Sequence, residues 1–531
     1  MRDIINTKNF ESYLFYFLIL LHIAYVFSLP VFLTQDGPSH LYNSKIFLDY
    51  IFNENNQLFN QFFELNSNII PNYLHSLILC ILLFFFNPFI AEKIIIALLI
   101  ISMPLAFRFI MKKHNSSATF LSYPIFIFSN SYFLFYGFFN FQLSITILIL
   151  FIGKLIDYRD NLDYKNSFKL FFILTLLFFT HPVGYIIAVV VLLLEILLII
   201  YNNNSVPLEI EKITSYLLVI FPTLLLFIQF FVSANKSGSE LINISISKNA
   251  LLRLIDMNHL IVFSQNEEII YFLLFMVVLL NLLNTIFGKI VKKRNGFNKV
   301  MLMAIVFNIF VYFFINDKLA GGAYLNNRIS IYIYIFTLLF IGLRVRRFTY
   351  KQLTILVSTL IIIYSVIIRY PIQKKISTIT EDYLQTIELI PNNSILLPLS
   401  LNNYGLWDSR LLSPNLAIFK HISGYLGATK SIISMDNYEA NTGHFPIAWK
   451  DDVNPYNFLS TNKGAGIESN HPSVDIEGYN NRIDNKIDYV LIWGDKESSH
   501  YNERISAQLI NYKLINESLQ KGLWQLYIHN Q

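Results

Sequence analysis

The chain has 531 residues, of which 54% are hydrophobic and only 14% are charged. Stretches with almost no charge, such as 94–111 and 182–201, are too long and too apolar for the core helices of a soluble domain. Lipid accepts only helices or closed barrels, and only helices match this pattern. The formal net charge of +5 is small for this length and indicates no nucleic-acid partner. The composition therefore predicts an α-helical polytopic membrane protein embedded in a lipid bilayer.

Twelve apolar segments can be counted in chain order. They are 13–33, 69–86, 94–111, 118–134, 138–153, 168–180, 182–201, 214–233, 268–288, 299–315, 329–343 and 352–369. If all twelve crossed the bilayer from a cytoplasmic start, four basic turns would face outward, against the cytoplasmic preference of Lys and Arg. These turns lie at 112–113, 154–169, 289–294 and 344–347.

Reassigning the segment 69–86 resolves this conflict. Pro71 and Asn72 interrupt its start, and Asn87-Pro88 closes it. If it lies on the surface or is re-entrant, all four basic turns face the cytoplasm. The chain then has about 11 spans, a first external loop at about 34–93 and a cytoplasmic N-terminus. An ordinary span at 69–86 is the alternative.

Residues 1–370 form the expected transmembrane domain, and the composition becomes polar from about Pro371. The remaining residues, 371–531, are numerous enough for one soluble domain. Strand-like runs at 394–399, 489–493 and 523–528, with a helix expected near 501–511, predict a small α/β domain. With an odd number of spans this C-terminal domain is exoplasmic, and the expected location is the cytoplasmic (inner) membrane.

The sequence Asp36-Gly-Pro-Ser-His40 lies where the first apolar segment ends. Pro38 favours the first turn of a helix, which we expect over about 38–52. Asp36 either caps this helix or, with His40 one turn away, forms a catalytic pair or a divalent metal site. Burial of a carboxylate near lipid is energetically unfavourable, so its presence at the bilayer boundary favours a functional interpretation. His40 equally fits an interfacial histidine that is satisfied by water.

Two cations are expected at the same outer face. Lys93 is either a snorkelling anchor paired with Glu92 or a cation for a lipid phosphate. Arg328 could share the phosphate-binding role, and Asp317 lies in the loop just before it, together with Gly321-Gly322.

Polar groups in two further external turns are also candidate substrate ligands. Asn140 lies in Gly-Phe-Phe-Asn-Phe at 137–141, where it is available to a sugar, although the aromatic residues also fit an interfacial belt. His181 precedes Pro182 between two apolar segments and also fits a simple turn.

Aromatic and polar residues alternate in the tail as they do in sugar-binding surfaces, and they fit ordinary loops as well. These are Trp407-Asp408, His421, 441–446 and His471-Pro472. The chain contains no Cys/His zinc spacing, no phosphate-binding glycine loop, no Gly-x-Ser-x-Gly elbow and no ATP motif, so an ATP-driven pump is unsupported.

This layout resembles the GT-C class of polytopic glycosyltransferases, which includes protein O-mannosyltransferases and bacterial lipid A aminoarabinose transferases. The similar features are an acidic residue just outside the first span, a long first external loop, many spans and an exoplasmic C-terminal domain. The chain also resembles bacterial membrane proteins of unassigned function with an Asp-Gly-Pro-x-His opening and a Gly-Phe-x-Asn-Phe turn, here 36–40 and 137–141.

The resemblance implies transfer of a sugar from a polyprenyl-phosphate donor to a glycan, lipid or protein acceptor outside the cytoplasmic membrane. In that class the first-loop acid activates the acceptor or binds a divalent cation such as Mg²⁺ or Mn²⁺, and only Asp36 matches its position. The chain departs from the class in having Gly37 after Asp36 and no acid near Asn140 in the second external turn.

Two other functions stay open. A transporter or flippase for a lipid-linked glycan would need ionisable residues deep within the spans, where Glu195 is the main example. A membrane-anchored cell-envelope assembly protein would act through its tail.

Overall fold

The computed structural model describes residues 2–52, 56–201, 206–235, 249–287, 295–315, 317, 323–345, 347–407, 410–461, 466–494, 501–518 and 523–530. Within these residues, ten helical segments are long and apolar enough to cross a membrane. They are α1 (Arg2–Phe27), α5 (Pro88–His114), the segment Ser116–Tyr136, α8 (Phe139–Tyr158), α10 (Pro182–Tyr201), α11 (Val206–Asn235), α13 (Glu268–Phe287), α14 (Asn295–Phe314), α15 (Leu325–Arg344) and α16 (Lys351–Leu384). The prediction of a polytopic helical membrane protein is confirmed.

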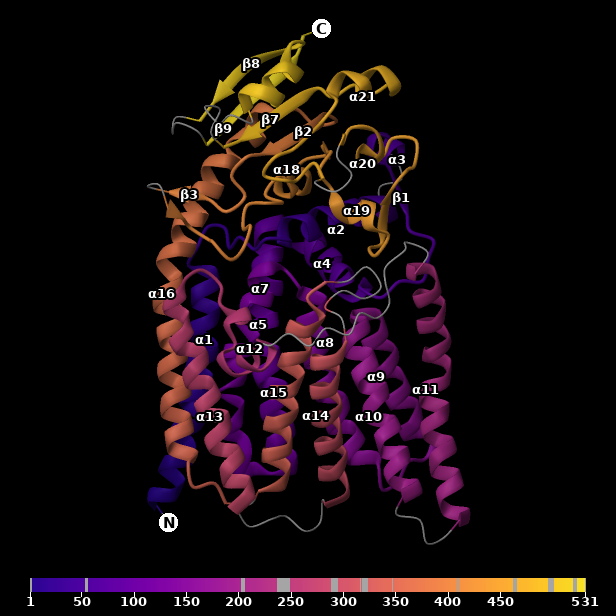
Figure 1. Ribbon diagram of the computed structural model, residues 1–531, viewed down its shortest axis with the longest axis vertical. Coiled ribbons are helices and arrows are strands. Elements are labelled where there is room, and N and C mark those ends of the chain that lie inside the picture. Colours follow the sequence, from indigo (N-terminus) through magenta and orange to yellow (C-terminus); the bar gives the residue numbers. More distant parts are fainter. Residues whose placement is uncertain are drawn as a thin grey trace.

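The helices form one bundle with the sheet-containing tail at one end (Figure 1). The eleventh predicted span corresponds to α9 (Tyr164–Thr180), a 17-residue helix that packs against α8, α10 and α11. The two chain ends lie at opposite ends of the molecule, and the basic C-terminal turns of α5 and α15 lie at the end away from the sheet (Figure 1). The predicted basic turn at 289–294 falls outside the described residues.

The segment 69–86 forms the short helix α4 (Tyr73–Phe85), which has 13 residues. Such a helix rises only about 20 Å, less than the apolar thickness of a bilayer. It packs against α2 (Gly37–Phe52), α5 and α9, at the end of the bundle beneath the tail (Figure 1). These contacts agree with a surface segment and not with a span.

The predicted apolar segment 118–134 is a broken helix. It consists of the 3₁₀ turn η1 (Ser116–Ser122), α6 (Ile125–Ser129) and α7 (Tyr132–Tyr136). The hydroxyl of Ser131 donates to the carbonyl of Phe128, and the buried Arg369 guanidinium of α16 donates to the carbonyl of Asn130. Irregular backbone is tolerated at membrane depth only where protein groups satisfy it. Arg369 also pairs with Glu267, with 2.6 Å between Nη2 and Oε2.

The tail contains a five-stranded sheet in the order β5 (Ile433–Ser434), β2 (Ile395–Ser400), β7 (Tyr489–Trp493), β9 (Trp524–His529) and β8 (Tyr512–Glu517). The first three strands are parallel and the last two pairings are antiparallel. The strands predicted at 394–399, 489–493 and 523–528 are present. The helix expected near 501–511 is present over Tyr501–Leu509, as a π-helix (Tyr501–Ile505) followed by a 3₁₀ helix (Ser506–Leu509) and not as a regular α-helix, and β8 begins at Tyr512.

The tail and the membrane bundle share a continuous helix and a continuous core. α16 runs through Pro371, where the composition changes, and ends at Leu384 near the sheet. In addition, β1 (Phe63–Leu65) of the first loop pairs antiparallel with β6 (Ile447–Trp449) of the tail. Because the two regions bury apolar surface against each other, the tail is docked on the first loop and not merely tethered.

Two glycines allow the helix α18 (Gly424–Thr429) of the tail to approach α2 closely. A Cβ atom on Gly424 would lie 2.4 Å from the carbonyl oxygen of Pro38, and one on Gly427 would lie 2.4 Å from the ring of Tyr42. Only glycine permits these distances. The tail therefore lies directly on the helix that carries the Asp36–His40 motif.

Candidate functional site

The segment after α1 turns back toward the bundle and carries Asp36 with it. The backbone amide of Val31 donates to Oγ of Ser377 (3.1 Å), and Nε2 of Gln373 donates to the carbonyl of Leu33 (3.2 Å). Val31 thus contacts Ser377, and the later residue Leu33 contacts the earlier residue Gln373. The segment therefore runs antiparallel to α16. Asp36 consequently lies deeper than the end of α1, beside the C-terminal end of α7.

The two sequence motifs at 36–40 and 137–141 meet directly. The backbone amide of Asp36 donates to the carbonyl of Tyr136 (3.0 Å), and Nε2 of His40 lies 2.8 Å from the carbonyl oxygen of Gly137. Gly137 has a φ of +100°, and a Cβ atom there would lie 2.7 Å from Cβ of Asp36. The glycine is thus required both by the left-handed backbone and by the close approach of the acid.

The carboxylate of Asp36 does not act as the cap of α2. Within the described contacts, no α2 amide donates to it; only the backbone carbonyl of Asp36 accepts, from the amide of His40 (3.0 Å). Its Oδ1 instead lies 3.3 Å from Nε2 of Gln35 and 3.7 Å from Nε2 of His421. The side chain is 8% exposed.

Burial raises the pKa of Asp36 to about 6, because a buried carboxylate loses the solvation of its charge. The charge of His40 opposes this shift, and that of Glu439 adds to it. A carboxylate with a pKa of about 6 is still ionised at neutral pH and is a stronger base than an ordinary aspartate, as general base catalysis requires.

His40 is a charged link between the first loop and the tail. Its Nδ1 lies 2.6 Å from Oε1 of Glu439 in α19 (Tyr438–Thr442), while its Nε2 faces the carbonyl of Gly137. Burial by itself lowers the pKa of His40, but the carboxylates of Glu439 and Asp36 and the carbonyl of Gly137 together raise it to about 9. Both ring nitrogens therefore carry a proton and donate to protein oxygens. His40 is thus a cation beside Asp36, where a catalytic pair was predicted.

Sequence reasoning missed the acid Glu439, and it named His421 only as one of many polar tail residues. His421 stacks on Tyr438, with ring centroids 4.2 Å apart, and burial holds its pKa well below the usual value, so the ring is neutral. A polar Asn-Tyr-Glu-Ala-Asn stretch at 437–441 was the only local signal. The tail thus supplies half of the groups around Asp36.

A further acid, Glu92, lies on the other side of Gly37. Its Oε2 accepts from the hydroxyl of Tyr425 (2.6 Å), while its Oε1 is buried and has no hydrogen-bond partner in the described residues. A Cβ atom on Gly37 would lie 2.3 Å from that Oε1. Gly37 therefore leaves room for the Glu92 carboxyl of α5 at the start of α2.

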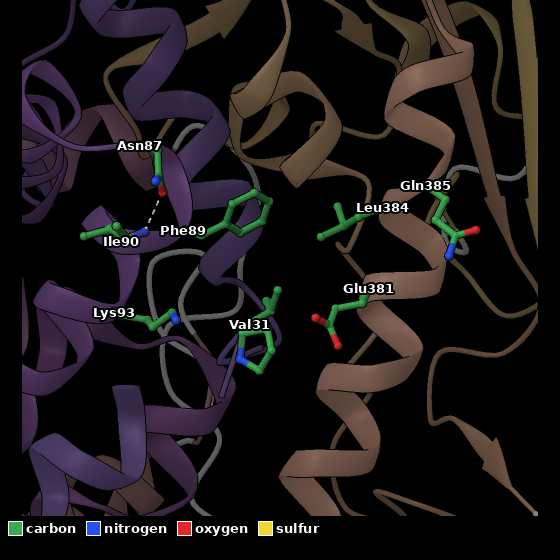
Figure 2. Close-up of a pocket in the computed structure, with 9 residues that line it drawn as sticks. Val31, Asn87, Phe89, Ile90, Lys93, Glu381, Leu384 and Gln385 are labelled. Carbon is green, nitrogen blue, oxygen red and sulfur yellow. Dashed lines mark hydrogen bonds between the residues drawn. The ribbon is translucent and has the colours of Figure 1, made fainter. Parts of the chain in front are cut away.

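Lys93, the next residue, points away from this cluster. Its Nζ donates to the carbonyl of Leu29 (2.7 Å) and lines a separate cavity between α5 and α16 (Figure 2).

Arg328 and His181 are hydrogen-bonded to each other. Nη1 of Arg328 lies 3.3 Å from Nε2 of His181, and a guanidinium nitrogen can only donate. Nδ1 of His181 lies 3.2 Å from the amide nitrogen of Val183, and burial, assisted by the Arg328 charge, holds the pKa of His181 well below its usual value, so the ring is neutral. Nε of Arg328 is buried and has no hydrogen-bond partner in the described residues.

The remaining contacts of Arg328 are aromatic. Its guanidinium lies 4.3 Å from the ring centroid of Phe138 and 5.6 Å from that of Phe141. None of the ion pairs found in the described part of the chain involves Arg328. Arg328 and Lys93, predicted to share one phosphate, belong to two different clusters.

Asn140 and Asp317 bind backbone groups at helix starts. Oδ1 of Asn140 accepts from the amide of His75 (3.0 Å), and its Nδ2 donates to the carbonyl of Asn72 (3.1 Å), which fixes the start of α4. Oδ1 of Asp317 accepts from the amide of Asn326 in the first turn of α15 (2.9 Å). These contacts give both residues a structural role.

The residues around Asp36 do not form a metal site in this structure. No group of three His, Cys, Asp or Glu side chains in the described residues converges as metal ligands. His40 fits a ligand role poorly, because both of its nitrogens are directed at protein oxygens. We therefore derive no step through a metal.

No family model and no curated protein sequence matches the chain.

Proposed function

We propose that this chain is a GT-C-like membrane glycosyltransferase that moves a sugar from a polyprenyl-phosphate donor to an acceptor outside the cytoplasmic membrane. The observation that carries the proposal is the position of Asp36. It is a buried carboxylate with a pKa of about 6, held where the bundle, the first loop and the tail meet. Such a group at a bilayer boundary is a site hypothesis by default, and its pKa suits a general base.

In the proposed reaction, the carboxylate of Asp36 removes the proton from an acceptor hydroxyl. The acceptor oxygen forms a bond to the anomeric carbon of the donor sugar, and the bond between that carbon and the phosphate oxygen breaks. The electron pair leaves with the polyprenyl phosphate. His40, held as a cation by Glu439, favours the ionised form of Asp36 before the proton is transferred.

The Arg328–His181 pair supports a phosphate-bearing donor. Nε of Arg328 is buried without a hydrogen-bond partner in the described residues, so a phosphate oxygen beside it would accept from it. The positive charge of Arg328 would also stabilise the charge that develops on the leaving phosphate.

The proposed orientation follows from charge. The basic ends of α5 and α15 would face the cytoplasm, and the tail at the opposite end of the bundle would be exoplasmic (Figure 1). A lipid-linked donor presents its phosphate at the headgroup level, close to the end of the bundle that carries Asp36.

The transporter alternative has less support, because Glu195 and Glu11, two acids within the spans, are each paired with an arginine. Glu195, the residue that suggested it, accepts from Nε and Nη2 of Arg159 at 2.7 and 3.2 Å. Glu11 likewise binds Arg108 through two hydrogen bonds. Bidentate pairs of this kind hold helices together, and these two carboxylates are not free to carry a substrate.

The test is a transfer assay combined with identification of bound lipid. Purified wild-type protein should contain polyprenyl phosphate detectable by mass spectrometry, and should transfer sugar from a lipid extract of its source membranes. Asp36→Asn should abolish transfer and keep the bound lipid. The matched control is Asp49→Asn, which changes an aspartate of α2 that pairs, among the described residues, with Lys45 and Asn56. Full transfer by a well-folded Asp36→Asn protein would refute the mechanism.

A further inference from the structure

A cavity of about 510 Å³ lies between the segment after α1, the start of α5 and the C-terminal part of α16 (Figure 2). Its lining residues are Pro30, Val31, Asn87, Phe89, Ile90, Lys93, Glu381, Leu384 and Gln385. The apolar span of α1 ends at Phe27, and Nζ of Lys93 binds the carbonyl of Leu29, two residues beyond that end. The cavity therefore lies at the level of lipid headgroups.

The lining combines an apolar wall with one charge of each sign. Lys93 projects from α5 and Glu381 from α16, and the two charged groups point toward one another across the cavity (Figure 2). They do not bind each other directly, since no ion pair between them occurs in the described residues. Two opposite charges separated by an open cavity are complementary to a ligand that carries both charges.

We infer that this cavity binds the headgroup of phosphatidylethanolamine. The lipid phosphate would accept from Nζ of Lys93, and its primary ammonium would donate to the carboxylate of Glu381. The apolar side chains of Phe89, Ile90 and Leu384 would contact the glycerol and the upper acyl chain. A headgroup that is only anionic would satisfy Lys93 and be repelled by Glu381.

This site is separate from the Asp36 cluster, and its assignment gives Lys93 a role other than binding the donor phosphate. It still touches the proposed reaction centre through α5. Lys93 faces the cavity, while the adjacent Glu92 faces Gly37 and the hydroxyl of Tyr425. A bound lipid would hold the first turns of α5 in place and so hold Glu92 against the residue that follows Asp36.

The experiment measures headgroup preference by native mass spectrometry of delipidated full-length protein, titrated with dioctanoyl phosphatidylethanolamine or dioctanoyl phosphatidylglycerol. The wild type should bind the ethanolamine lipid at least tenfold more tightly. Glu381→Gln should remove this preference, and Lys93→Gln should weaken both lipids about tenfold. The matched control Glu388→Gln, at an exposed acid outside the cavity, should keep the wild-type preference.

Equal binding of the two lipids by the wild type, or an undiminished preference in Glu381→Gln, would overturn the assignment. Glu381 is exposed, so its variant tests the site even if Lys93→Gln fails to fold. Asp36→Asn separates the two proposals, since it should keep the headgroup preference and lose sugar transfer.

Discussion

Nδ1 of His40 lies 2.6 Å from Oε1 of Glu439, with side chains that are 8% and 1% exposed. This buried ion pair joins the helix that follows the first span to the short helix α19 of the tail. Since His40 also faces the carbonyl of Gly137, a single imidazolium connects the first loop, the broken span and the tail around Asp36.

Removal of the Glu439 charge should destabilise the docked tail. Glu439→Gln leaves the His40 cation buried without its carboxylate, which typically costs about 3–5 kcal/mol. We expect a lower thermal midpoint for the detergent-solubilised protein. The control Glu477→Gln, at an exposed acid of α21 (Ile476–Arg482), should leave the midpoint unchanged. If the thermal midpoint of Glu439→Gln equals that of the control, the His40–Glu439 ion pair does not stabilise the docked tail.

The same pair predicts a loss of stability at alkaline pH. The pKa of His40 rises from 6.5 in the unfolded chain to about 9 in the folded one, so folding favours its protonated form. The resulting stabilisation is fully present below pH 6.5 and is lost as the pH rises through about 9. Limited proteolysis of the tail should therefore accelerate between pH 7 and pH 10. Glu439→Gln should flatten that dependence, and an unchanged profile would contradict it.

Asp36 should set the acid limb of the pH–rate profile. Its pKa of about 6 means that the basic form is depleted as the pH falls below that value. The rate of sugar transfer should rise with pH up to about 7, and Asp36→Asn should lower it by a factor of about 10² to 10⁴. A transfer rate that stays constant from pH 5 to pH 7.5 would argue against Asp36 as the base.

Gly137→Ala should disturb the Asp36 site through both strain and contact. The new Cβ atom would lie 2.7 Å from Cβ of Asp36, at a φ of +100°. We expect a destabilisation of more than about 1 kcal/mol and a loss of transfer. Gly443→Ala is the matched control, because Gly443 has a φ of +67° but nothing within 4 Å of the new atom. If both variants reduced transfer equally, the close contact between Gly137 and Asp36 would not be needed for transfer.

Arg328→Gln should reduce the polyprenyl phosphate that remains bound after purification, because it removes the cation and the buried Nε donor that has no hydrogen-bond partner in the described residues. Arg159→Gln, which alters a structural pair with Glu195, is the control and should retain the lipid. The amount of bound lipid is measured by mass spectrometry. Retention of wild-type amounts in Arg328→Gln would place the phosphate elsewhere.

Local sequence pattern was sufficient for the secondary structure of most of the chain. A helix that crosses lipid needs about 20 consecutive apolar residues, and a buried strand needs a short apolar run, so both leave a continuous signal. The segments at 352–369 and 489–493 are examples, found in α16 and β7. The unusual composition of 69–86 likewise indicated a segment that does not span.

The break at 116–136 left a weaker signal. Pro124 marks one interruption, but the donation from Arg369 to the carbonyl of Asn130 involves a residue far along the chain. Nothing near Asn130 in the sequence indicates that partner.

The motif at 36–40 could be recognised from the sequence as a polar centre at the bilayer boundary, because five local residues and the end of an apolar run define it. The role of each residue in the motif could not be recognised from the sequence. The charge of His40 depends on Glu439, and the environment of Asp36 depends on Gly137 and His421. These groups meet because β1 pairs with β6 and α18 packs on α2. Burial and charge pairing are properties of that packing, which brings distant segments together. Only the tertiary structure therefore decided which acid is buried with a raised pKa and which histidine is held as a cation.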